Sequence, residues 1–290
     1  MNDLETFWQG TFEIWQNKDF GEIYAEYSNR KRYLIDNIQI FVSHRPLIGN
    51  VTLYLYCAPF EGDWLSKLVS LAKNLNTAKI WIYSANPLQT LSKFSKEELL
   101  TLILNLTDDK EVIWKTIGDK TRNMIRKGRK NKVNIKLVEE EKEFNEWWNV
   151  YSNVSQTKGF GKQNYLLVKT LFREKKLAKL FVSVKDNKII GGSFFLTDKY
   201  PVYWLGAFDR NYGNCAPSHI NIWEAIISFK ENGYKLLDLG GIALNREDGT
   251  TLFKKSFGGE MKKGYIYEMS VNKFKTCVLE FISQIKNIKR

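Results

Sequence analysis

The stretch SHINIWEAIISFKENGYKLLDLGGI (residues 218–242) indicates the fold class. Its first part is predicted to be a helix, because Ser218 can cap the helix N-terminus and Gly233 is a typical residue for its C-terminal end. The apolar run KLLDLGGI that follows is short and contains two glycines, as expected for a buried strand. A helix joined to a buried strand by a short turn indicates a domain that mixes helices with a sheet.

The segments on either side of this stretch are also predicted to contain both helices and strands. Residues 179–209 contain two or three strands joined by tight turns at Asp186-Asn187 and Asp198-Lys199. Residues 108–130 are predicted to form one helix with an acidic start and a basic end, which suits the helix dipole. The N-terminal third adds strands at IQIFVS, NVTLYLYCAP and KIWIYSANP. We therefore predict an α+β fold in two halves, with mostly antiparallel strands.

Composition restricts the class of protein. With 290 residues, the chain can form one large domain or two of ordinary size. Its three cysteines have no paired spacing and it has only two histidines, so we predict a reduced, cytoplasmic protein without a metal centre or disulfides. The sequence has no apolar run of membrane-spanning length and no secretory signal. The net charge of +12 favours an anionic partner, such as nucleic acid, a nucleotide-linked substrate or an anionic membrane surface.

Residues 115–136 form a basic stretch that is a candidate nucleic-acid contact. On a helix Arg122, Arg126 and Arg129 share a face, and Lys130 continues the basic run. Such a stripe suits phosphate contacts, which give salt-dependent affinity that does not depend on base sequence. The alternative is a solvated charged face without a partner.

The loop RNYGNCAPS (residues 210–218) joins a predicted strand to the helix quoted above. It resembles the R-x-x-G-x-[GA] loop with which Gcn5-related N-acetyltransferases hold the pyrophosphate of coenzyme A at a helix N-terminus. Cys215 stands where glycine or alanine is usual, and Pro217 removes one amide donor. Coenzyme A binding and an ordinary turn both stay open at this point.

Four motifs in register resemble the FemABX family of aminoacyl-tRNA-dependent peptidyltransferases. They are DKTRNMIRKGRK at 119–130, YWLGAFD at 203–209, WEAIISFKENGYKLLDLGGI at 223–242 and LFKKSFGGE at 252–260. The resemblance implies two acetyltransferase-like (GNAT-type) lobes, without the coiled-coil arm of some members. We expect the first lobe over residues 1–106, joined by the returning C-terminal segment 266–290. The second lobe is expected over residues 107–265.

The same resemblance implies the activity and its central residues. The family transfers an amino acid from aminoacyl-tRNA to an amine of a peptidoglycan precursor, and related folds modify other peptidic acceptors. The Phe-Lys pair of its reaction centre matches Phe253 and Lys254, with Lys255 as the adjacent alternative. In this ester aminolysis a fixed ammonium stabilises the oxyanion that develops on the attacked carbonyl. Phe253 would exclude water, and the flanking glycines would let a bulky substrate approach the backbone.

Further site residues follow by the same comparison. Lys199 and Tyr203 match residues that hold the phosphates and sugar of the precursor, and Lys18 matches a precursor-binding lysine. Asn86 stands where the family often has aspartate, and Arg210 is predicted to bind substrate. Asp238 is expected to satisfy the glycine turn that follows it. The predicted tRNA contacts are Arg122, Arg126, Arg129 and Lys130.

Two other functions remain open. An acyl-coenzyme A-dependent N-acyltransferase of the same superfold would use the RNYGNCAPS loop for its donor. A non-enzymatic RNA-binding protein with an inactive acyltransferase core would not need Lys254. The leading reaction requires no metal ion and no cofactor beyond the aminoacyl-tRNA.

Overall fold

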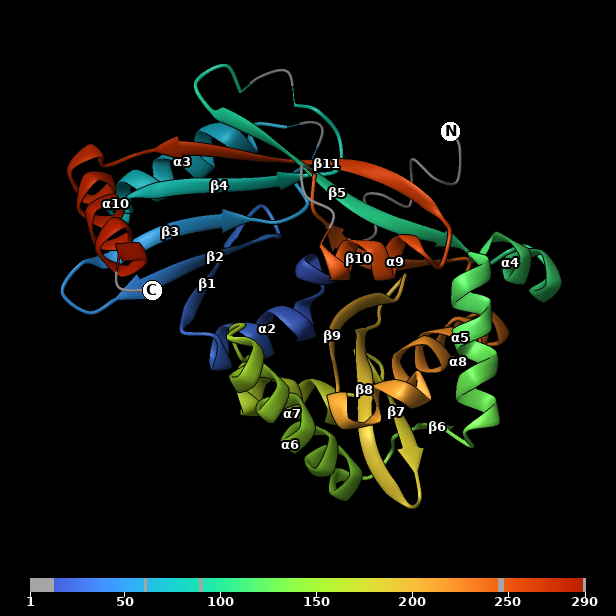
Figure 1. Cartoon of the computed structure of the whole chain (residues 1–290). Coiled ribbons are helices and arrows are strands. Elements are labelled where there is room, and N and C mark those ends of the chain that lie inside the picture. The colour runs from blue at the N-terminus through green and yellow to red at the C-terminus, as the bar shows by residue number, and fades with distance from the viewer. Residues whose placement is uncertain (1–12, 60–61, 89–90, 245–247, 289–290) are drawn as a thin grey trace. The chain divides into compact units, whose positions relative to one another are not determined.

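The computed structural model describes residues 13–59, 62–88, 91–244 and 248–288. The chain forms two compact units (Figure 1). The larger unit comprises Leu100–Lys262 with Glu13 and Ile14, and the smaller unit comprises Trp15–Leu99 and the segment from Lys263. The unit boundaries differ from those of the predicted lobes at residues 13–14, 100–106 and 263–265, of which 100–105 lie in strand β5 (Ser95–Asn105) and 263–265 lie in β11 (Glu260–Ser270).

The larger unit is a sheet covered by helices. Its strands follow the order β5-β10-β9-β8-β7-β6, in which β9 and β10 are parallel and the other neighbours are antiparallel. The elements after β5 are α4 (Lys110–Thr116), α5 (Asp119–Lys130), β6 (Asn134–Leu137), α6 (Glu141–Lys158), α7 (Tyr165–Arg173), β7 (Ala178–Lys185), β8 (Lys188–Leu196), β9 (Val202–Phe208), the 3₁₀ helix η2 (Arg210–Cys215), α8 (Pro217–Glu231), β10 (Leu236–Ile242) and α9 (Gly249–Lys255).

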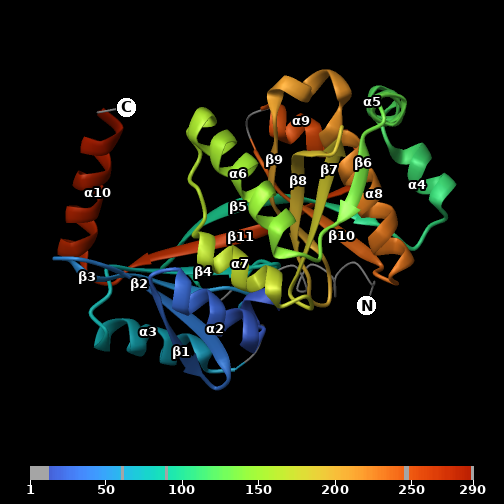
Figure 2. The same ribbon diagram turned by 90° about the horizontal axis from the view of Figure 1, so that it is seen from below.

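Helices pack on both faces of this sheet. Successive side chains of a strand point to opposite faces, and two adjacent phenylalanines of β8 mark the two layers. Phe194 stacks on Trp147 of α6 at 5.8 Å between ring centroids, whereas Phe195 meets Phe229 of α8 edge-to-face at 5.0 Å. Figure 2 shows α6 and α8 on opposite sides of β7, β8 and β9. A strand buried on both faces explains why β8 reads as a nearly continuous apolar run.

In the smaller unit the strands follow the order β1-β2-β3-β4-β11. Strands β3 and β4 are parallel, and the other neighbours are antiparallel. The short helix η1 (Ile14–Gln16) precedes its elements, which are α2 (Lys18–Tyr27), β1 (Arg30–Ile35), β2 (Ile38–Arg45), β3 (Gly49–Leu55), α3 (Trp64–Asn74), β4 (Lys79–Ser84), the C-terminal part of β11 and α10 (Lys273–Ile288).

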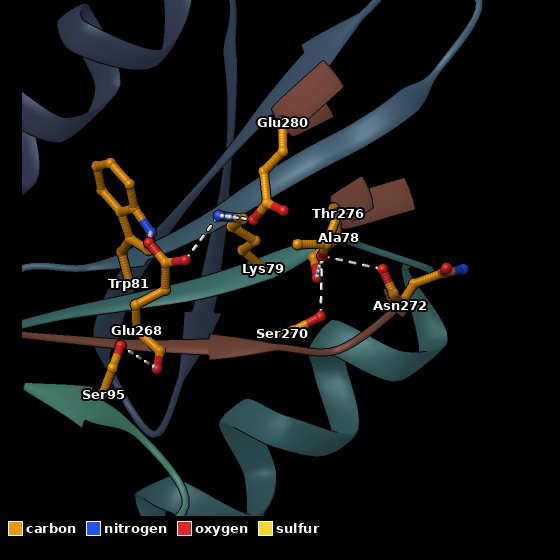
Figure 3. A network of polar contacts seen from close by, with 9 residues as sticks. All are labelled: Ala78, Lys79, Trp81, Ser95, Glu268, Ser270, Asn272, Thr276 and Glu280. Atoms are coloured by element: carbon orange, nitrogen blue, oxygen red, sulfur yellow. Dashed lines mark hydrogen bonds and ion pairs between the residues drawn. The ribbon is translucent and has the colours of Figure 1, made fainter. Parts of the chain in front are cut away.

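Polar contacts fasten β11 and α10 to β4 in the smaller unit. Figure 3 shows the carboxylate of Glu268 between Lys79, which donates at 2.7 Å, and the indole N–H of Trp81. At the start of α10 the hydroxyl of Thr276 donates to the carbonyl of Ala78 at 3.1 Å. The C-terminal segment is therefore tied to β4 by side chains as well as by strand pairing.

The α+β prediction is confirmed, but two local predictions are wrong. The predicted single helix at 108–130 is two helices, α4 and α5, because the amide of Gly118 donates to the carbonyl of Ser256 at 3.0 Å instead of continuing the helix. Ser218 is not the N-cap of α8, since Ala216 takes that position with Pro217 at the first helical residue, where a missing N–H has no cost. No helix in the described part of the chain is long and apolar enough to cross a membrane.

Candidate active site

The lysine pair lies in the last turn of the short helix α9. Asp248 caps this helix, because its side chain accepts a hydrogen bond from the amide of Thr251 at 2.8 Å. The hydroxyl of Thr251 in turn accepts from the amide of Ala243 at 3.1 Å. The start of α9 is thus fixed against the end of β10. The last turn of α9 contains Lys254 and lies beside the same strand.

Lys254 is the lysine that points at β10. Its ammonium donates to the carbonyl oxygen of Gly241 at 2.8 Å and lies 5.9 Å from the ring centroid of Tyr203. Burial lowers the pKa of Lys254, and the charges of Asp238 and Asp248 act in the opposite direction. An ammonium that is partly desolvated and held by one carbonyl keeps two further N–H donors for a ligand.

The strand β10 carries a glycine bulge beside this ammonium. Its pairing with β5 shifts register between Asp238 and Gly241, and Gly240 adopts a φ of +78°. A Cβ at Gly240 would lie 3.0 Å from the carbonyl oxygen of Tyr203 and 3.3 Å from the Lys254 Nζ. Only glycine combines this backbone conformation with this closeness.

Asp238 anchors the bulge from inside the protein. Asp238 is 4% exposed, and its Oδ1 accepts hydrogen bonds from the amide of Gly240 at 2.6 Å and from the hydroxyl of Thr101. Burial raises the pKa of Asp238 to about 6, while the two hydrogen bonds and the charge of Lys254 pull it down. The prediction that Asp238 satisfies the glycine turn is confirmed.

Tyr203 presents its ring to Lys254. The ring packs 5.3 Å from Phe195, and the hydroxyl fills the space that a side chain at Gly206 would need. Burial raises the pKa of Tyr203 to about 12, so the phenol stays protonated at neutral pH. The structure therefore brings Tyr203 and Lys254 together through the ring of the tyrosine.

Phe253 packs into an aromatic group on the other side of α9. Its ring meets His219 edge-to-face at 5.1 Å and Phe257 at 5.2 Å. Burial lowers the pKa of His219, which favours a neutral imidazole beside the site. The sequence assigns no role to His219, because no partner stands at catalytic spacing from it along the chain.

The glycines after the lysine pair have a different role from the one predicted. A Cβ at Gly258 would lie 2.7 Å from the carbonyl oxygen of Thr116, and one at Gly259 would lie 2.5 Å from that of Ile103. Both glycines have positive φ. They let the chain pass closely over α4 and β5, so their close approach is to the protein's own backbone. A cavity of about 900 Å³ lies beside them, and its lining does not include Lys254.

Some basic side chains of α5 form ion pairs within the protein, and others are exposed without one in the described part of the chain. The guanidinium of Arg122 donates to three carbonyl oxygens at the end of α4, of which that of Ile117 at 2.8 Å is the nearest, and pairs with Asp119. Arg129 pairs with Glu224 at 2.9 Å. Arg126 lies 5.5 Å from the ring centroid of Trp114 and is exposed. Three exposed lysines make no ion pair within the described part of the chain; they are Lys120, Lys127 and Lys130.

Of the remaining predicted residues, Lys199 and Arg210 belong to the larger unit, and Lys18 and Asn86 belong to the smaller unit. Lys199 pairs with Glu13 at 3.5 Å. Arg210 is exposed and lines a groove of about 710 Å³ along α6. Lys18 is the exposed first residue of α2, and Asn86 follows β4 with its amide bonded to the Ser84 hydroxyl at 3.3 Å. Each of these four stays a prediction.

The loop that resembles a coenzyme A cradle is folded on itself. Residues Arg210–Cys215 form η2, in which the amides of Asn211 and Tyr212 donate to Asp209, and the amide of Ala216 donates to Gly213. At the start of α8, Pro217 has no amide hydrogen. The amides of Asn211, Tyr212 and Ala216 are thus already bonded within the loop, and Pro217 supplies none.

Comparisons with known proteins agree with this fold. A family model described as an acetyltransferase (GNAT) domain matches residues 119–255. Among solved structures, that of FemX is similar with a TM-score of 0.73 and 12% identity, covering 97% of this chain and 99% of that one. A C-terminal domain assigned to a lysylphosphatidylglycerol synthetase from Agrobacterium fabrum gives 0.67 and 12%, covering 97% and 96%. L-PGS from Bacillus licheniformis gives 0.59 and 10%, covering 87% and 91%.

Curated protein sequences give no significant match. At these identities the structural likeness establishes the fold. The chain therefore has a FemABX-like fold that contains a GNAT-type domain, as its four motifs predicted.

Proposed function

We propose that the protein is an aminoacyltransferase that moves an amino acid from aminoacyl-tRNA to an amine of a peptidic acceptor. The observation that carries this proposal is the Lys254 ammonium, partly desolvated and fixed between the Gly241 carbonyl and the Tyr203 ring. The FemABX-like fold supports the same reaction class. A fixed positive charge in a site of low polarity favours a reaction in which negative charge develops on a carbonyl oxygen.

The reaction follows from these groups. The acceptor amine attacks the ester carbonyl that joins the amino acid to the ribose, so a C–N bond forms and the carbonyl oxygen becomes an oxyanion. One of the free N–H groups of Lys254 donates to this oxyanion. The intermediate then collapses, the ester C–O bond breaks, and the proton lost by the amine passes to the ribose oxygen. Phe253, packed against His219 and Phe257, limits the access of water to this centre.

The donor tRNA would be held by the exposed cations of α5 that form no ion pair in the described part of the chain. Lys120, Lys127 and Lys130 recur at helical spacing on the exposed side, away from the buried Thr121, Ile125 and Gly128. We propose that these lysines and Arg126 contact phosphates, whereas Arg122 and Arg129 mainly hold α5 in place. Replacement of the three lysines by glutamine should weaken tRNA binding and reduce its salt dependence, because each lost phosphate contact lowers the slope of log K against log salt by about 1.

The acceptor proposed first is a peptidoglycan precursor, nucleotide-linked or lipid-linked. This choice of acceptor rests on the sequence motifs and on the cationic residues Lys18, Lys199 and Arg210. Asn86 and Tyr203 complete the proposed substrate-binding set. Because aminoacyl-tRNA is the donor, we place the reaction in the cytoplasm.

The test is a transfer assay with mixed radiolabelled aminoacyl-tRNAs and a UDP-linked muramyl peptide. Lys254→Ala should abolish transfer, while Lys255→Ala is the matched control with the same charge change one residue away. Circular dichroism verifies that both variants fold. Retention of transfer by Lys254→Ala would refute the role of the lysine, and failure of every tRNA with wild-type protein would refute the donor class.

The match of residues 119–255 to an acetyltransferase (GNAT) domain favours a second candidate. This candidate is an acyl-coenzyme A-dependent N-acyltransferase. The internally bonded η2 loop argues against it. Calorimetry with coenzyme A distinguishes the two candidates. Binding of coenzyme A that acetyl-coenzyme A competes away would support the N-acyltransferase. Absence of binding would support the aminoacyltransferase.

A further inference from the structure

The Gly240–Gly241 bulge connects a buried carboxylate to the lysine of the proposed reaction. On one side of the bulge lies Asp238, and on the other lies the ammonium of Lys254. We propose that Asp238 is a positioning residue that sets the location of the Lys254 ammonium by bracing this bulge. The functional consequence rests on the proposed role of Lys254, whereas the geometric coupling does not.

The brace begins at the neighbouring strand. Thr101 of β5 lies opposite Gly241 in the strand register and is buried. Its hydroxyl donates to Oδ1 of Asp238, the same oxygen that accepts from the amide of Gly240. Two donors from different strands therefore converge on one buried oxygen, and the bond at 2.6 Å from Gly240 fixes the first peptide of the bulge.

The bulge then passes this constraint to the lysine. Since Gly240 has a φ of +78°, the chain turns there, and the carbonyl of Gly241 faces the Lys254 Nζ at 2.8 Å. The helix α9 fixes the lysine backbone from its other end through the Asp248 cap. The side chain of Lys254 still has several rotatable bonds, and the Gly241 carbonyl is the group that restrains its end. Loss of the Asp238 acceptor would leave the Gly240 amide unpaired and release that carbonyl.

Four substitutions separate this role from simple stabilisation of the core. Asp238→Ala removes the acceptor, and Asp238→Asn keeps an oxygen acceptor without the charge. Thr101→Val removes the donating hydroxyl, and Thr101→Ser restores it. The control is Ser183→Ala, which deletes a fully buried hydroxyl of β7 that bonds to Pro217 and Asn221. Circular dichroism and thermal unfolding first establish which variants fold.

In the transfer assay, Asp238→Ala should lower kcat by about 10- to 100-fold, because a displaced catalytic group commonly has an effect of this size. The KM for aminoacyl-tRNA should stay within about twofold, since tRNA is bound elsewhere. Asp238→Asn and Thr101→Ser should retain most of the kcat, and Ser183→Ala should match wild type. A kcat as low for Asp238→Asn as for Asp238→Ala would overturn the brace in favour of a charge effect.

A second measurement does not depend on activity. Limited acetylation with acetic anhydride, followed by mass spectrometry, gives the labelling rate of Lys254 relative to Lys255 in the same peptide. Asp238→Ala should change this ratio at least about threefold, and Ser183→Ala should leave it unchanged. An unchanged ratio in folded Asp238→Ala would refute the positioning role. If wild-type protein transfers no amino acid at all, the proposed function fails, and this ratio still decides the coupling.

Discussion

The buried carboxylate of Asp238 should make the stability of the protein depend on pH in a defined direction. Burial raises its pKa from the ordinary value of 3.8 to about 6. A group whose folded pKa is raised favours the folded state when it is protonated, so its contribution is fully present below about pH 4 and is lost as pH rises through 6. The shift of about 2 units corresponds to about 3 kcal/mol at high pH, because each unit is worth about 1.4 kcal/mol.

The assay compares wild type with Asp238→Asn, which cannot titrate. Urea unfolding at a series of pH values from 4 to 8 should show the stability of wild type falling relative to the variant by about 2 to 3 kcal/mol. For a unit of this size that corresponds to about 5 to 10 °C in Tm. Glu231→Gln, which removes an exposed charge from the same unit, controls for the loss of one carboxylate. A difference that stays constant within about 0.5 kcal/mol from pH 4 to 8 would refute the argument from burial.

Three further substitutions test the packing around the site and in the smaller unit. Gly128→Ala should destabilise the protein by about 1 kcal/mol in urea unfolding, because the new Cβ would lie 2.9 Å from Ile220 and the cost of this overpacking exceeds the gain in helix propensity. Increased stability of this variant would contradict the tight contact of α5 with α8. Arg122→Ala should lower stability by about 1 to 2 kcal/mol, because the carbonyl oxygens at the end of α4 lose the guanidinium that donates to them. Lys127→Ala should leave stability nearly unchanged. Equal effects of these two would mean that Arg122 is not structural. Glu268→Ala should cost about 1 to 3 kcal/mol in thermal unfolding, since the Trp81 indole loses its acceptor, and a Tm equal to that of wild type would count against the network in Figure 3.

Much of the fold could be predicted because its signals are local. The apolar run KLLDLGGI is a strand, and Gly233 lies just past the end of α8, as glycine commonly does. The break between α4 and α5 could not be predicted, since it depends on a bond from Gly118 to Ser256, a residue far along the chain. The N-terminus of α8 was misread because a serine two residues inside the helix has the side chain of a cap, and only the proline before it marks the true start.

In the candidate site, too, local sequence signals could be read, whereas contacts between residues far apart along the chain could not. The Phe253–Lys254 motif pointed to Lys254 as a candidate, but it did not indicate which groups contact its ammonium. Thr101 and His219 reach the site through strand pairing and helix packing, which leave no mark in the sequence nearby. Gly258 and Gly259 were assigned to substrate access, whereas their neighbours are carbonyls of α4 and β5. Side chains that act at a distance along the chain are visible only once the fold brings them together.

The contacts that fix Lys254 have a consequence for how such proteins can diversify. The cap at Asp248, the brace at Asp238 and the ring of Tyr203 all belong to the larger unit. Substitutions in the smaller unit can therefore accumulate without a direct penalty on the geometry of the ammonium.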